Sequence, residues 1–474
     1  MIQRVINRYW MACGVRAFIR LGVPDALAGG GLSLRHLAEQ CDAHPDFLAR
    51  LLRALAPHAL VAADATTNQW WLPPVGETLI TGRRGALEAV IERWESPAYE
   101  HDLRVLPELL TSAVTTRPGL LLDLLSPPAA NSASATEMSD PQRSIADLLT
   151  AFGDLAALRV AAEHRWADKL RDGALSAADL AERTGVHPDP VREIADRLRT
   201  LDVLTSPVDD HYELTAAGQT LRYDRPDSMR PALQMCGHPV WWGAMWHLDT
   251  VVGTGQPYLA PGTSAYDVIG GDPVAQSVFD RFMTCRSAPI AEALRIWAAT
   301  AAIEPGSVIV DVGGGRGTLL AALLEELPGC RGVLLERSVV LPAARTYLAD
   351  HQMSGRCEVV GGDFFAQVPS GDVHLLGSVL HNWSDKDAVA ILNGIRGATT
   401  GTGRLVIVEY VLPNGPEPHS GYGMDLRGMG LFAGGRERTA AEFTTLLTEA
   451  GFTLLAACSL PHGLTRMIAV PTAA

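Results

Sequence analysis

Lysine is almost missing from this 474-residue chain, in which it occurs only at Lys169 and Lys386. Arginine therefore supplies nearly all of the 39 basic residues, against 53 acidic ones, and the formal net charge is −14. Binding to the phosphates of nucleic acids needs clustered basic side chains. An acidic chain without a basic cluster therefore predicts no nucleic-acid partner.

Paired cysteines and long apolar runs are missing as well. The seven cysteines are scattered and form no C-x-x-C pair, which argues against a disulfide framework or a zinc site. No run of 18 apolar residues occurs, and the first residues lack the apolar region of a secretory signal. We therefore expect no metal, no membrane span and a cytoplasmic location.

One sequence pattern occurs twice in the amino-terminal half, at residues 32–60 and 175–203. Leu-Ser, Leu-Ala-Glu and His-Pro-Asp recur in both copies in the same order and at the same spacing. Apolar residues at helical spacing follow His-Pro-Asp, so each copy predicts helix, turn, helix and hairpin, the pattern of a winged helix. Residues 126–143 between the copies are rich in Pro, Ser and Ala and indicate a flexible linker.

From Ser307 onward, short β-branched runs alternate with helical segments, which predicts a mainly parallel sheet. The predicted fold is α/β, with a Rossmann-like carboxyl-terminal domain preceded by two mainly helical winged-helix units. A long helix over about 144–170 is expected to open the second unit. The expected segments are 1–112 for the first unit, 113–143 for the linker, 144–302 for the second unit and 303–474 for the Rossmann-like domain.

A glycine-rich turn, Asp311-Val312-Gly313-Gly314-Gly315-Arg316-Gly317, follows the first predicted strand of this domain. Glycines let the backbone turn tightly and let a ligand approach it, and the helix N-terminus that follows favours an anionic group. The dinucleotide spacing G-x-G-x-x-G fails, because Thr318 stands at the third glycine position. The turn alone is also compatible with a purely structural role or a nucleotide site.

Two further strand ends carry residues suited to an adenosyl group. Glu336 ends the second predicted strand, where a carboxylate can bind a ribose diol. Asp363 and Phe364 end the third, where the carboxylate can accept from an adenine amino group and the ring can pack on the base. The alternatives are a solvated loop carboxylate for Glu336 and a plain turn aspartate beside a core aromatic.

Five segments in a fixed order then point to a family: DVGGGRG, GGDFF, VLHNWSD, VEYVLP and GGRERT. Over roughly residues 144–472 the chain resembles the S-adenosylmethionine-dependent small-molecule O-methyltransferases, typified by plant caffeic-acid methyltransferase and bacterial antibiotic-tailoring enzymes. The resemblance implies S-adenosylmethionine as cofactor and a small hydroxylated aromatic or polyketide-type acceptor. The additional copy at 1–112 lies outside the usual layout, so a homodimer and a pseudo-dimeric monomer are both expected possibilities.

The resemblance also implies roles for individual residues. It makes His381 the general base, flanked by Glu409 and Glu437, and histidine suits this role because its ordinary pKa is about 6.5. The predicted cofactor-binding residues are Asp311, Gly313, Gly315, Glu336, Asp363, Phe364, Ser378 and Trp383. The predicted substrate-binding residues are Trp242, Phe282, Met283, Asn382, Met424 and Asp425. Several of the apolar ones fit a core position equally well.

Two other functions stay open at this point. Some relatives bind S-adenosylmethionine without transferring its methyl group and instead carry out hydroxylation, decarboxylation or pericyclisation. The presence of His381, Glu409 and Glu437 favours methyl transfer over these reactions. A DNA-binding regulator is the third hypothesis, which the mixed or apolar second helices of both winged-helix copies disfavour.

Overall fold

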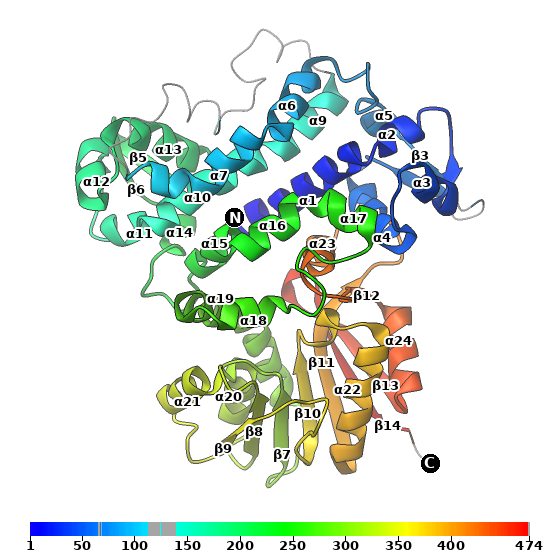
Figure 1. Cartoon of the computed structure of the whole chain (residues 1–474). Coiled ribbons are helices and arrows are strands. Elements are labelled where there is room, and N and C mark those ends of the chain that lie inside the picture. Colours follow the sequence, from blue (N-terminus) through cyan, green and yellow to red (C-terminus); the bar gives the residue numbers. More distant parts are fainter. Residues whose placement is uncertain (65–66, 68, 112–123, 125–138, 473–474) are drawn as a thin grey trace. The chain divides into compact units, whose positions relative to one another are not determined.

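The computed structural model describes residues 1–64, 67, 69–111, 124 and 139–472 (Figure 1). The chain divides into two compact units, Met1–Ala260 and Pro261–Ala474. The four segments expected from the sequence stay a prediction, and most of the expected linker at 113–143 lies outside the described residues. Among the residues that are described, no helix is both long enough and apolar enough to cross a membrane.

Both predicted winged-helix copies form in the first unit, each with two helices and a small three-stranded sheet. Pro45 and Pro188 stand at equivalent first positions of the second helices, where proline costs no hydrogen bond. The first copy contains β1 (Leu32–Ser33), α3 (Leu34–Gln40), α4 (Pro45–Leu55), β2 (Ala62–Asp64) and β3 (Gln69–Trp71). The second contains β4 (Leu175–Ser176), α12 (Ala177–Thr184), α13 (Pro188–Thr200), β5 (Leu204–Val208) and β6 (His211–Leu214).

Further helices precede and follow each copy. The continuous helix expected over 144–170 was wrong: the segment forms three helices, and Arg165 takes a left-handed φ of 59° before the third. Around the first copy lie α1 (Ile2–Arg20), α2 (Val23–Ala26), α5 (Pro74–Glu77), α6 (Glu88–Glu95) and α7 (Pro97–Leu109). Around the second lie α9 (Asp140–Leu149), α10 (Ala151–Glu163), α11 (Trp166–Lys169), α14 (Ala216–Gln219), α15 (Arg230–Gly237), α16 (Pro239–Trp246) and α17 (Leu248–Thr254).

The second unit is built on one mixed sheet in the order β13-β14-β11-β10-β7-β8-β9, with β12 paired to β11. Strands β7 to β11 run parallel, and β14 runs antiparallel to both β11 and β13. The strands are β7 (Val308–Val312), β8 (Arg331–Glu336), β9 (Cys357–Gly361), β10 (Gly371–Gly377), β11 (Thr399–Leu412), β12 (Arg438–Thr439), β13 (Phe452–Ser459) and β14 (Leu464–Pro471). This arrangement confirms the predicted Rossmann-like domain.

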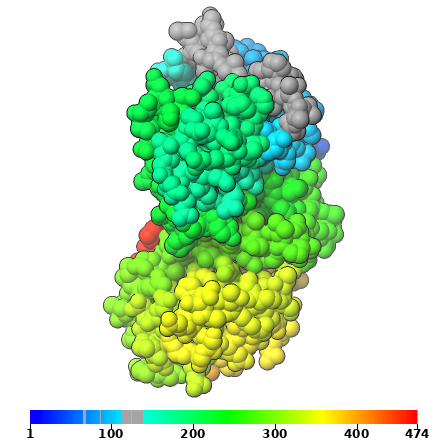
Figure 2. Space-filling model, turned by 90° about the vertical axis from the view of Figure 1, so that its left-hand side faces the viewer, coloured from blue at the N-terminus to red at the C-terminus, as the bar shows by residue number. Residues whose placement is uncertain are grey.

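Helices pack along this sheet, and the buried side chains of its central strands form the core between them. Figure 2 shows the unit from the side of α20 and α21, which cover the β8–β9 end of the sheet. The helices of this unit are α18 (Ala265–Gly270), α19 (Pro273–Ala298), α20 (Thr318–Glu326), α21 (Leu341–Asp350), α22 (Asp385–Ala398), α23 (Gly421–Leu431) and α24 (Ala440–Glu449).

The strand order fixes where a ligand can bind. From β7 the chain moves outward to β8 and β9, and it then returns to the other side of β7 with β10 and β11. Ligands of open parallel sheets bind outside the carboxyl ends of the strands, where the order reverses. The glycine-rich turn after β7 and the VLHNWSD segment after β10 both lie at this edge.

Candidate active site

The glycine-rich turn adopts a conformation that needs glycine at each of its four glycine positions. Gly313, Gly315 and Gly317 have φ of 69°, 60° and 84°, in the left-handed region that other residues avoid. Gly314 is needed for space instead, because a Cβ there would lie 2.2 Å from the carboxyl carbon of Asp311. The backbone of the turn therefore lies directly against a buried carboxyl group.

Asp311 lies beneath the turn, completely buried at the end of β7. Burial raises the pKa of its carboxyl group to about 7, and the nearby charge of Glu336 raises it further in the same direction. Asp311 therefore packs against the buried side of the glycine-rich turn.

Glu336 joins the end of β8 to the same turn. Its carboxylate accepts hydrogen bonds from the backbone N–H groups of Gly315 and Arg337, both at 2.8 Å. Burial raises the pKa of Glu336, whereas these backbone donors lower it. A carboxylate fixed in this way still has lone pairs for the two hydroxyls of a ribose, as the sequence predicts.

A cavity of about 480 Å³ lies over the turn, within the size range of small-molecule sites. All predicted cofactor-binding residues except Asp311 line it, including Gly313, Gly315, Asp363, Phe364, Ser378 and Trp383. These side chains come from the carboxyl ends of four parallel strands, β7 to β10. The structure thus brings together residues that lie far apart in the sequence.

Aromatic rings form one wall of this cavity. Trp383 packs edge-on against both Phe364 and Phe365, with ring centroids 5.7 Å and 4.8 Å apart. Phe365 was missed from the sequence, although it directly follows the predicted Phe364. Together with the Glu336 carboxylate and the glycine turn, this wall fits S-adenosylmethionine, which carries a purine, a ribose diol and an amino-acid carboxylate.

His381 lies next to the cavity-lining residue Asn382, in a short 3-10 helix (Leu380–Asn382) that follows β10. Its ring nitrogen Nδ1 lies 2.8 Å from Oε1 of Glu437 and 3.7 Å from Oε2 of Glu409. All three side chains are buried, with exposed fractions of 6% or less. The structure therefore brings the three predicted catalytic residues into direct contact.

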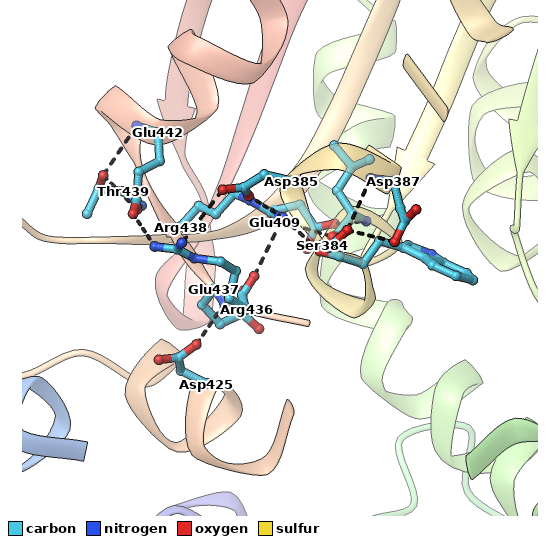
Figure 3. A network of polar contacts seen from close by, with 12 residues as sticks. Ser384, Asp385, Asp387, Glu409, Asp425, Arg436, Glu437, Arg438, Thr439 and Glu442 are labelled. Carbon is cyan, nitrogen blue, oxygen red and sulfur yellow. Dashed lines mark hydrogen bonds and ion pairs between the residues drawn. The ribbon is translucent and has the colours of Figure 1, made fainter. Parts of the chain in front are cut away.

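Backbone hydrogen bonds hold this trio in place, and Figure 3 shows its two carboxylates, Glu409 and Glu437, with Asp425. Glu409, on β11, accepts from the N–H groups of Val379 and Leu380, both at 2.8 Å. Asp425, on α23, accepts from the N–H of Glu437 at 2.8 Å. Glu409 therefore fixes the turn that carries His381, and Asp425 fixes the segment that carries Glu437; the predicted contact of Asp425 with substrate stays a prediction.

Arg438 also belongs to this hydrogen-bond network. Its guanidinium donates to the carbonyl oxygens of Leu380 and Trp383, at 2.9 Å and 2.8 Å, and to the carboxylate of Asp385. The side chain is fully buried. One arginine thus joins β12 to the turn that carries both the predicted base, His381, and the predicted cofactor-binding ring of Trp383.

Burial sets the protonation of the trio. It lowers the pKa of His381 to about 3; Glu409 opposes this shift, and the positive charges nearby, beginning with Arg286, add to it. Burial raises the pKa of Glu437 to about 8, and the charge of Asp425 raises it further. Burial thus favours the neutral form of the imidazole and raises the pKa of both carboxyl groups that flank it.

The ligand atoms of His381, Glu409 and Glu437 lie within 4.8 Å of one another, close enough to surround a metal ion. Three cations, Arg286, Arg427 and Arg438, contribute positive charge to the same environment. Their charge disfavours a divalent cation between the carboxylates. The arrangement favours a hydrogen-bonded imidazole over a metal centre.

Apart from Asp425, the predicted substrate-binding residues fall into three groups. Met283 and Asn382 line the cavity, and the Asn382 amide donates to the Tyr266 hydroxyl at 2.8 Å. Phe282 and Met424 are buried in α19 and α23 and are not among the described residues that line this cavity. Trp242 belongs to the core of the first unit, where its ring stacks on Trp246.

Sequence reasoning missed Tyr266 and Phe279, which also line the cavity. They lie on α18 and α19, the helices that precede the Rossmann-like strands. Helical spacing alone does not say which face of a helix meets a cavity, so the sequence held no signal for them.

Comparison with known proteins gives an independent result. The family profile described as O-methyltransferase domain matches residues 247–453, and the profile described as O-methyltransferase dimerisation domain matches residues 3–82. The phenazine O-methyltransferase of Lysobacter antibioticus is 33% identical over 68% of this chain and 94% of its own length. The aclacinomycin 10-hydroxylase of Streptomyces purpurascens is 35% identical over 65% of this chain and 84% of its own length.

Solved structures agree with these similarities. An O-methyltransferase from neocarzinostatin biosynthesis, crystallised with S-adenosylmethionine and 2-hydroxy-5-methyl naphthoic acid, matches with a TM-score of 0.56 and 33% identity. The match covers 67% of this chain and 96% of that protein.

Proposed function

The chain belongs to the S-adenosylmethionine-dependent O-methyltransferase family of natural-product biosynthesis, and we propose that it methylates a hydroxyl group of a small aromatic or polyketide-type compound with His381 as general base. The observation that carries this proposal is the buried contact of His381 Nδ1 with Glu437, backed by Glu409. Bound S-adenosylmethionine supplies an electrophilic methyl group on a sulfonium centre.

In this proposal the two nitrogens of the imidazole have different roles. Ionised Glu437 accepts the hydrogen bond from Nδ1–H, so the lone pair of the neutral ring lies on Nε2. A phenolic acceptor has a pKa of about 10, and a base that takes its proton speeds the reaction at neutral pH. In this proposal Nε2 takes that proton, and Glu437 and Glu409 stabilise the imidazolium that forms.

The lining of the cavity supports an aromatic acceptor. Tyr266, Phe279 and Met283 add apolar surface to the cavity, and Asn382 with the Tyr266 hydroxyl adds one polar group. The names of the similar proteins refer to phenazine, naphthoate and hydroxybenzoate compounds, which are aromatic. We infer an acceptor of this class.

Turnover with a panel of dihydroxy-aromatic compounds tests the proposal. We expect S-adenosylhomocysteine and a product heavier than the acceptor by one CH₂ group, in equal amounts. A panel that includes dihydroxynaphthoates, phenazinols and anthracycline aglycones and gives no S-adenosylhomocysteine with any of them would contradict it.

A hydroxylase is the second candidate, because one similar protein is named aclacinomycin 10-hydroxylase. The buried trio argues against it, since hydroxylation needs no base aimed at an acceptor hydroxyl. A product heavier by one oxygen atom, formed without S-adenosylhomocysteine, would favour this candidate.

The protonation of Glu437 makes the rate depend on pH. Its pKa is raised to about 8, so the carboxyl group is protonated below that pH and ionised above it. Only the ionised form carries the negative charge that stabilises the imidazolium, and we therefore expect kcat to fall about tenfold per pH unit below pH 8 and to level off above it. The Glu437→Gln variant should lose this dependence along with most of the rate.

The acceptor's own ionisation provides the control for this profile. Two acceptors with different phenol pKa values should give the same midpoint if Glu437 controls the rate. A midpoint that follows the pKa of the acceptor would contradict the assignment.

A further inference from the structure

The two winged-helix copies pack against each other through contacts that come in reciprocal pairs. The backbone N–H of His44 donates to the carbonyl of Val252 at 2.9 Å, and the N–H of His187 donates to the carbonyl of Leu110 at 3.1 Å. His44 and His187 are the same histidine of the repeated His-Pro-Asp segment. Leu110 and Val252 also occupy corresponding positions, because the alignment of the two copies shifts by one residue after the His-Pro-Asp segment. Each bond therefore joins one copy to the other. The two bonds correspond to each other, with the roles of the two copies exchanged.

Two buried arginines form a second reciprocal pair, because Arg16 and Arg159 stand at equivalent positions of the two copies. Arg16, on α1, donates to the carbonyl of Trp246 on α16. Arg159, on α10, donates to the carbonyl of Arg104 on α7 at 3.0 Å. The acceptor residues Arg104 and Trp246 correspond to each other in the same shifted alignment as Leu110 and Val252. Arg16 and Arg159 have exposed fractions of only 7% and 4%, so both bonds lie inside the packed unit.

Equivalent residues also meet each other directly. Tyr9 and Phe152 occupy the same position in the two copies, in register with the His-Pro-Asp segments, and their rings pack edge to face with centroids 5.7 Å apart. They lie on α1 and α10, which pack against each other along the middle of the unit. A residue that touches its own counterpart marks the position of a twofold axis in a symmetric dimer.

This pattern is that of an isologous interface, in which residue i of one partner contacts j of the other and j contacts i. Here both partners belong to one chain. The profile for the dimerisation domain matches residues 3–82, the copy whose sequence leads into the segment 112–138 and not directly into a Rossmann-like unit. The chain thus contains two winged-helix copies and one catalytic unit.

We propose that residues 1–111 are a built-in dimerisation partner, which occupies the dimerisation surface of the second copy, so that the enzyme works as a monomer with one active site. The residues that join the two copies are buried within one chain. Leu110 and Val252, on opposite copies, have exposed fractions of 1% and 0%. The surface is therefore not open to a second copy of the chain.

The mass of the intact chain in solution tests this proposal. Light scattering after size-exclusion chromatography should give the mass of one chain, 50.7 kDa, unchanged over a dilution of about 100-fold. Activity per milligram, or the rate of S-adenosylmethionine binding if no acceptor is yet known, should be constant over the same range. A stable mass of two chains, or activity lost on dilution, would overturn the proposal.

A pair of matched arginine variants tests the contact itself. Arg16→Ala removes the bond to Trp246 and the guanidinium 4.4 Å over the Trp246 ring, so we expect Tm to fall by several degrees. Arg35→Ala removes an exposed ion pair with Glu39 inside the first copy and should leave Tm unchanged. Equal Tm values for Arg16→Ala, Arg35→Ala and wild type would show that the copies do not depend on this packing and would overturn the proposal.

Discussion

Replacing His381 by alanine is expected to lower kcat by about 10²- to 10⁴-fold, the usual contribution of a general base. S-adenosylmethionine affinity should stay within a few-fold of wild type, because the cofactor cavity is lined by other side chains. The reason is geometric: Nδ1 is held by Glu437 at 2.8 Å, so Nε2 alone is available for the acceptor proton. Steady-state kinetics together with calorimetry of cofactor binding would separate the two quantities.

A histidine outside the site serves as the control for this variant. His211 lies exposed at the start of β6, where its ring nitrogen Nδ1 contacts the backbone of its own turn, and His211→Ala should keep wild-type kcat. If His381→Ala also keeps kcat within a few-fold of wild type, His381 is not the base.

Replacing Gly314 by alanine is expected to weaken binding of S-adenosylmethionine by about 100-fold. A Cβ at this position would lie 2.2 Å from both the carboxyl carbon and Oδ2 of Asp311. Asp311 is completely buried, so the glycine turn itself has to move. Forcing a methyl group into a packed site costs about 1–3 kcal/mol, and roughly 1.4 kcal/mol corresponds to a tenfold loss of affinity.

Gly397 provides a matched control in the same unit. It lies in α22, and a Cβ there would meet nothing within 4 Å beyond its chain neighbours and the backbone of its own helix. Gly397→Ala should leave cofactor affinity unchanged. The double variant Gly314→Ala/Asp311→Ala should recover part of the lost affinity because the collision is removed. Wild-type affinity for Gly314→Ala alone would contradict the geometry of the turn.

The sequence predicted the frame of the site well, because its motifs stand at strand ends. Parallel strands of one sheet bring their carboxyl ends to one edge, so the turn at Gly313, Glu336, Asp363 and Trp383 were expected to meet there. The cavity brings these residues together. Periodicity and motif order are sufficient for such a prediction, since both are properties of neighbouring residues.

Contacts between distant segments could not be predicted in this way. The bonds from Val379 and Leu380 to Glu409 depend on the register of β10 against β11, and the contact of Asp425 with the N–H of Glu437 depends on how α23 packs. The repeat predicted two similar units. It held no sign that Arg16 and Arg159 each donate to a carbonyl of the other copy.

Protonation is the point at which the expectation from sequence was wrong. The sequence predicts an ordinary histidine pKa of about 6.5, which suits a general base. Burial lowers the pKa of His381 to about 3 and raises that of Glu437 to about 8. The pH dependence of the reaction therefore depends on the carboxyl group that orients the imidazole.

The fate of a labelled methyl group tests the central claim most directly. The enzyme would be supplied with S-adenosylmethionine that carries a CD₃ group and with an acceptor that contains both a phenolic hydroxyl and an amino group. The account predicts one CD₃ group on the phenolic oxygen for each S-adenosylhomocysteine formed. A label on nitrogen, or an unlabelled product that has gained an oxygen atom, would contradict it.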